Sequence, residues 1–116
     1  MVNNNKKMLL KTVIVSLALI SSPALASLHT VQMKSISYDP KIIEIKVGDT
    51  LQWINKSYTE HSATSYEDEN PASKFDTGLI KPKNTSEKIL FKSSGTFLYH
   101  CIVHGQSMTG KISVTE

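Results

Sequence analysis

Residues 43–55 read Ile-Glu-Ile-Lys-Val-Gly-Asp-Thr-Leu-Gln-Trp-Ile-Asn, so that apolar and polar residues alternate on both sides of a glycine-aspartate turn signal. A period of two is typical of half-buried β-strands, because successive side chains of a strand point to opposite faces. We therefore expect strands over 41–47 and 50–55, with Leu51 and Trp53 on one buried face.

Short strand patterns separated by turn signals fill the rest of the chain beyond residue 26. None of this sequence shows a sustained apolar period of the helical kind. Many short strands with turns between them predict an all-β fold, a Greek-key β-sandwich in a single domain. The other expected strands cover 29–37, 61–66, 75–80, 87–91, 96–101 and 110–115, with a polar loop over 67–74.

Residues 1–26 have the layout of a secretory signal peptide. Three lysines give a positive start, a mostly apolar run covers 12–20, and Ala-Leu-Ala at 24–26 offers a small-residue cleavage site. The apolar run is shorter than the roughly 20 residues that a membrane-spanning helix needs, which favours removal over retention as an anchor. We expect cleavage after Ala26, export to the periplasm without stable membrane insertion, and a mature domain over 27–116.

The charge balance argues against a nucleic-acid partner. The chain has 13 basic residues, all lysine, and 10 acidic ones, which gives a formal charge of +3. Three of the lysines lie within residues 1–26, so the remainder has 10 lysines against 10 acidic residues and no net charge. The basic character therefore belongs to the predicted signal peptide, and we expect no nucleic-acid binding.

The single cysteine, Cys101, cannot form an internal disulfide. In an exported protein an unpaired thiol is prone to oxidation and needs another explanation. His104 and Met108 follow Cys101 closely in the sequence. A thiolate, an imidazole and a thioether are soft donors that favour copper over calcium or magnesium. This run therefore predicts a copper site.

A second histidine would complete the donor set of a blue-copper site, in which two imidazoles and a thiolate form a plane and a methionine lies on the axis. His61 follows the 50–55 strand, so it could meet the end of the 96–101 strand at one pole of a sandwich. His29 lies beside the expected cleavage site, where we expect poor order. His100 adjoins Cys101 on a strand and should point to the opposite face. The candidate ligands are His61, Cys101, His104 and Met108.

Nearly the whole of residues 28–116 resembles the small cupredoxins, the blue copper proteins of the plastocyanin and amicyanin type. The resemblance implies a cupredoxin-like sandwich, one type 1 copper ion per chain and His61 as the second imidazole. It also implies a soluble, monomeric one-electron carrier that meets redox partner proteins transiently and is not an enzyme. The matching segments are Tyr38–Pro40, Val47–Asn55, Phe75–Gly78, Gly95–Cys101 and Met108–Val114.

The neighbours of the expected ligands depart from the family pattern. The gap between His104 and Met108 is intermediate between those of amicyanins and plastocyanins, so the resemblance does not fix the strength of the axial contact. Ser62 follows His61 where the family often has asparagine, and Val103 precedes His104 where it usually has proline. Residues around a ligand tune metal affinity and reduction potential.

Two other classes of function compete with the electron carrier. A periplasmic copper chaperone or an accessory factor of oxidase assembly usually has clustered methionines. Here Met1 and Met8 lie in the predicted signal peptide, and Met33 is distant in sequence from the 101–108 run. An enzyme is the other class, because His100 resembles the residue that bridges to a second copper in nitrite reductases and multicopper oxidases. Such a site needs further histidines, and this chain offers only His29.

The acidic run Glu67-Asp68-Glu69 has two interpretations. It could be a docking patch for a redox partner, because patches of opposite charge speed encounters between proteins. The sequence favours the other interpretation, a solvated loop, which is the usual setting of such a run.

Overall fold

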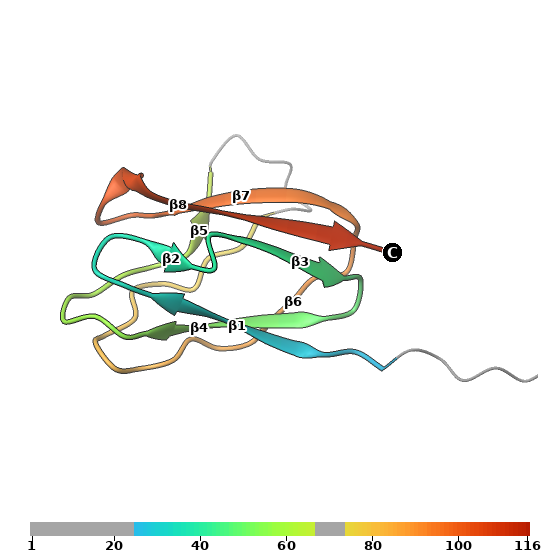
Figure 1. Ribbon diagram of the computed structural model, residues 1–116, viewed down its shortest axis with the longest axis horizontal. Helices are drawn as coiled ribbons and strands as arrows, with labels where there is room; N and C mark the ends of the chain where they lie inside the picture. The colour runs from blue at the N-terminus through green and yellow to red at the C-terminus, as the bar shows by residue number, and fades with distance from the viewer. Residues whose placement is uncertain (1–24, 67–73) are drawn as a thin grey trace, which may run out of the picture.

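The computed structural model describes residues 25–66 and 74–116, where the regular structure consists of strands in two sheets that pack as a sandwich (Figure 1). One sheet has the order β2-β1-β4-β6 and the other β3-β8-β7-β5. The predicted all-β sandwich is confirmed. The strands are β1 (Leu28–Met33), β2 (Tyr38–Asp39), β3 (Ile42–Lys46), β4 (Thr50–Asn55), β5 (Thr64–Ser65), β6 (Ile89–Leu90), β7 (Gly95–Cys101) and β8 (Gly105–Thr115).

The connections bring several loops to one end of the sandwich. Strand β1 runs parallel to β4, so that Met33 pairs with Asn55, and β3 runs parallel to β8. The loops that follow β1 and β4 therefore leave from the same end. The turn between β7 and β8 lies at that end as well, at the left of Figure 1.

Strand β4 has the bounds expected from the sequence, whereas several other elements differ. The stretch 29–37 ends as a strand at Met33 and leads into β2, and the stretch 75–80 forms only isolated bridges at Asp76 and Ile80. The bounds predicted for the final strand are wrong, because β8 begins at Gly105 and not at residue 110.

Strand β8 is longer than expected because its residues alternate between buried and less buried from Met108 onward. A register shift between His100 and Cys101 lets β7 pair with β8 on both sides of this irregularity. Gly110, which suggested the start of a strand, lies inside β8 against the ring of Tyr99. A Cβ atom at Gly110 would stand 2.6 Å from Cε1 of Tyr99, so only glycine fits beneath that ring.

Aromatic residues occupy the centre of the sandwich. Trp53 and Tyr99 are fully buried, with their rings edge to face at 5.5 Å, and the indole N–H donates to the Tyr99 hydroxyl at 3.3 Å. Phe97, Tyr99 and Cys101 share the buried face of β7. The predictions that Trp53 belongs to the core and that Phe97 and Tyr99 pack on the same face as Cys101 are confirmed.

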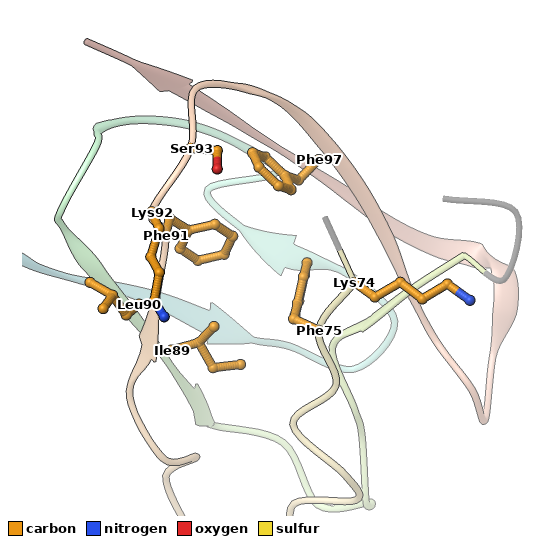
Figure 2. A pocket seen from close by; sticks show the side chains of 8 residues that line it. All are labelled: Lys74, Phe75, Ile89, Leu90, Phe91, Lys92, Ser93 and Phe97. Carbon is orange, nitrogen blue, oxygen red and sulfur yellow. The ribbon is translucent and has the colours of Figure 1, made fainter. Parts of the chain in front are cut away.

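A pocket of about 320 Å³ lies at the aromatic edge of this core (Figure 2). The rings of Phe91 and Phe97 meet edge to face at 5.3 Å, and Phe75 meets Phe91 at 5.6 Å. Lys74 and Lys92 also line the pocket. None of the four candidate ligands does, so the pocket is separate from the candidate site.

Some predictions concern residues that the structure does not describe. The signal peptide lies outside the described residues except at its last two positions, and Glu67-Asp68-Glu69 lies outside them entirely. In the described part of the chain, no helix is long and apolar enough to cross a membrane. The expectation of poor order at His29 is wrong, because His29 belongs to β1 and its Nε2 lies 2.8 Å from the Asp49 carboxylate.

Candidate metal centre

His61 and Cys101 face each other at the loop-bearing end of the sandwich. Cys101 is the last residue of β7. His61 lies beyond the end of β4, and its backbone exchanges two hydrogen bonds with Ile80, of 3.2 and 2.7 Å. Both side chains are fully buried, and Nδ1 of His61 lies 3.8 Å from Sγ of Cys101. The fold therefore holds an imidazole nitrogen and a thiol sulfur in one enclosed place.

The surroundings of His61 favour the form of imidazole that binds metals. Its Nε2 lies 3.4 Å from the Thr59 hydroxyl, on the side away from Cys101. Burial lowers the pKa of His61, and the nearby His104 lowers it further by charge repulsion. A lowered pKa keeps the ring neutral near pH 7, and a neutral imidazole is the form that donates a lone pair to a metal ion.

Asn55 fixes the loop that leads to His61. This fully buried amide donates to the carbonyls of Thr59 at 2.8 Å and Ile80 at 2.9 Å. Its oxygen accepts from both the N–H and the hydroxyl of Ser57. Every polar group of the amide thus has a partner, which stabilises one conformation of the loop.

Ser62 joins the loop that contains His61 to the turn that follows Cys101. Its N–H donates to Sγ of Cys101 at 3.4 Å, and its hydroxyl accepts from the N–H of Ile102 at 3.1 Å. The same hydroxyl lies 2.8 Å from that of Thr64, which in turn donates to Asp76 at 2.9 Å. Because the carboxylate can only accept, the chain of donors runs from Ile102 through Ser62 and Thr64 to Asp76. This serine therefore makes a link between the two loops although it is not the asparagine common in the family.

Replacing Ser62 with alanine should lower the free energy of unfolding by about 1–2 kcal/mol, because the Ile102 N–H would lose its acceptor in a partly buried place. Thermal unfolding of the metal-free protein measures the loss. Thr64→Val is the matched control, since it removes the next hydroxyl but leaves the Ser62–Ile102 bond. An equal loss in both variants would show that the Ser62–Ile102 bond has no special role.

The other two candidate ligands belong to the turn and the strand that follow Cys101. His104 lies in the turn between β7 and β8, with its ring centroid 5.0 Å from that of His61. Its Nε2 is buried and, among the described residues, has no hydrogen-bond partner. Met108 is fully buried in β8 rather than in a loop. Within residues 25–66 and 74–116, no three His, Cys, Asp or Glu side chains already stand together as a metal cluster.

These donors nevertheless suit copper. A buried imidazole nitrogen without a partner is costly unless something binds it. Among the described residues Nδ1 of His100 and Nε2 of His104 are both in this state, and His104 is the one that lies beside His61. A thiol, two imidazoles and a thioether from the same end of the fold form the donor set that copper prefers. The carboxylates that calcium or magnesium would need are absent from the four candidates.

His100 points away from this place, as its strand position predicts. It is half-buried on the face of β7 opposite to Cys101, and its ring stacks on Tyr66 at 4.4 Å. The expected separation of His100 from the candidate ligands is confirmed.

Sequence reasoning missed the residues that support the site. Asn55 follows Leu51 and Trp53 on the buried face of β4. A polar residue at a position where the alternation predicts an apolar one could have indicated a supporting role. Thr64 and Asp76 carried no comparable signal, because their contact joins segments that are distant in sequence.

Comparison with known proteins places the chain among copper proteins. The profile of copper binding proteins of the plastocyanin/azurin family matches residues 25–115. A plastocyanin from Synechococcus sp. (strain JA-2-3B'a(2-13)) is 32% identical over 111 residues, which cover 85% of this chain and 82% of that protein.

Solved structures agree with this relationship. A reduced amicyanin variant superposes with a TM-score of 0.66 at 25% identity, over 84% of this chain and 87% of that one. The copper-containing nitrite reductase of Thermus scotoductus SA-01 superposes with a TM-score of 0.68 at 28% identity. This chain spans only 26% of the nitrite reductase, although 87% of the present chain is matched.

Proposed function

Because the chain belongs to the plastocyanin/azurin family of copper-binding proteins, we propose that it is a type 1 copper protein that carries single electrons between redox partners in the periplasm. The observation that best supports this proposal is the buried pair of His61 Nδ1 and Cys101 Sγ, which lie 3.8 Å apart at the end of the sandwich. We propose His61, Cys101, His104 and Met108 as the ligands of one copper ion.

Copper bound by these residues would supply a reversible one-electron couple. Cys101 would provide the thiolate, His61 and His104 the two imidazoles, and Met108 a thioether. The N–H of Ser62 donates to the Cys101 sulfur, and hydrogen bonds to that sulfur tune the reduction potential. The buried ligand pair also keeps water away from the sulfur.

His104 is the proposed port for electrons. It is half-buried in the turn after β7, next to Ile102 and Val103, which are 53% and 52% exposed. Exposed apolar residues beside a ligand favour brief docking of a partner without a stable complex. This arrangement supports transient redox partners and a monomeric carrier.

We propose that the protein is not an enzyme. His29 is the only histidine besides His100 outside the proposed ligand set, and it bonds Asp49 near the start of β4, at the end of the strand opposite to Asn55. A second copper beside His100 would therefore lack histidine partners within one chain.

The proposal is tested by loading the purified protein with Cu(II), recording its visible spectrum and titrating it with a reductant. We expect a strong thiolate-to-copper absorption band and a reversible one-electron wave. A colourless complex, or copper that is reduced and cannot be reoxidised, would contradict the role of electron carrier. Either result would favour the alternative, a copper chaperone or an accessory factor of oxidase assembly.

A further inference from the structure

The backbone nitrogen of Ser27 lies against a buried carboxylate. It donates to Oδ1 of Asp49 at 2.9 Å, while the Ser27 carbonyl accepts from the N–H of Thr50 at 3.0 Å. Both polar backbone groups of Ser27 are thus fixed at the start of β1. Ser27 is also the residue that follows the expected cleavage site.

Asp49 is equipped to meet a positive charge. It is only 5% exposed, and its Oδ2 lies 2.8 Å from Nε2 of His29 and accepts from the N–H of Lys46 at 3.0 Å. The N–H groups of Lys46 and Ser27, and then His29, hold its pKa at about 2, so the carboxylate stays ionised near pH 7. A buried negative charge is most stable beside a positive one.

We propose that the signal peptide is removed between Ala26 and Ser27 and that the α-ammonium group so formed pairs with Asp49, so that processing completes the charge balance of this corner of the fold. Hydrolysis by a signal-processing protease adds one water to the Ala26–Ser27 bond. The carboxylate leaves on Ala26, and the Ser27 nitrogen takes up protons to become an ammonium.

The position of the cut decides whether this pair forms. Leu25, Ala26 and Ser27 are all exposed, but it is the Ser27 nitrogen that bonds Asp49, so a cut before Leu25 or Ala26 would place the new charge on a nitrogen other than the one that bonds this carboxylate. A cut after Ser27 would remove the nitrogen that contacts Asp49. Of the described residues near the predicted site, Ser27 is the one whose nitrogen faces this carboxylate.

The pair should make stability depend on pH in a defined window. An α-amino group ordinarily has a pKa of about 7.7–8.0, and a facing carboxylate raises it. Its contribution is complete below that ordinary pKa and is lost as the pH rises through the raised pKa. The contribution of Asp49 is present above its ordinary pKa and is lost as the pH falls toward about 2. The other titratable groups that line this recess are His29, Glu44 and Lys46.

The test uses the full chain, exported and processed by a bacterial host. Intact mass should show a protein that begins at Ser27. In a second protein a glycine is inserted between Ala26 and Ser27, which moves the ammonium one residue away. Where the mass shows the inserted glycine as the first residue, we expect the thermal midpoint at pH 7 to fall by about 4 °C, as a modest loss of stability does in a domain of this size. The difference should disappear above the raised pKa.

Two substitutions identify the carboxylate. Titration of the α-amino group by NMR should give a raised pKa that returns toward its ordinary value in Asp49→Asn. Glu44→Gln is the matched control and should leave the raised pKa in place. A first residue other than Ser27, an α-amino pKa that Asp49→Asn does not change, or equal midpoints with and without the glycine would each overturn the proposal.

The pair of the Ser27 ammonium with Asp49 does not depend on the proposed copper site. Ser27 lies next to the start of β4, whereas His61 follows its end, and a six-residue strand is about 20 Å long. All of these variants should keep the visible band of the copper-loaded protein. Absence of the band from the unmodified protein would contradict the proposed function and leave the ammonium pair unaffected.

Discussion

Replacing Cys101 with serine is expected to abolish the visible absorption band of the copper-loaded protein. The band arises from charge transfer between a cysteine thiolate and copper, and the chain has no other cysteine to replace Cys101. The change removes a single sulfur from a fully buried position, so the fold should survive and remain measurable by thermal unfolding. Visible spectra of both proteins, loaded with equal amounts of Cu(II), measure the effect.

His100→Ala is the matched control for this substitution. His100 is the neighbour of Cys101 but lies on the opposite face of β7, stacked on Tyr66. We expect its removal to leave the band nearly unchanged. Loss of the band in the His100 variant, or its persistence in the Cys101 variant, would show that the proposed ligands are wrong.

Replacing Gly110 with alanine should destabilise the protein by about 3 kcal/mol, the upper end of what overpacking a core usually costs. The added Cβ would overlap the ring of Tyr99, which is fully buried and packs against Tyr38, Trp53 and Phe75. Chemical denaturation of the metal-free protein measures the loss, because copper would add its own stabilisation.

Gly78→Ala separates this overlap from a general effect of glycine. Gly78 is exposed, and a Cβ there would meet nothing within 4 Å, but its φ of +72° disfavours a side chain. The backbone strain alone costs about 1 kcal/mol. A loss in the Gly110 variant no larger than in the Gly78 variant would mean that the Tyr99 ring shifts readily, contrary to the packing described.

The sequence predicted the packing of strands in a sandwich better than the bounds of the individual strands. Strand β4 was predicted with its correct bounds because Leu51 and Trp53 alternate with polar residues between clear turns. The predicted final strand was shorter than β8, because a glycine such as Gly110 suggests the end of a strand. The structure shows that this glycine instead makes room for the Tyr99 ring. The segment 75–80 has strand-like residues but forms only bridges, a result that depends on its partners rather than on its own sequence.

The candidate site shows the same division. The donor types and close spacing predict a copper site from three residues alone, Cys101, His104 and Met108. The assignment of His61 as a ligand depended on the resemblance to a family. The structure adds the contact between His61 and Cys101 and the link through Ser62. Hydrogen bonds between residues distant in sequence, such as Thr64 to Asp76, follow from the packed fold and leave no local pattern to read.

Strand β8 lies inside its sheet, between β3 and β7, although it follows every other described strand in the chain. Until Thr115 has been synthesised, β3 lacks its neighbour in this sheet, because its pairing with β8 extends to that residue. Contacts between such distant segments form late and slowly. In a growing chain this sheet would therefore stay incomplete until β8 has been synthesised. The position of one strand would in this way make completion of the sheet depend on the last of the described strands.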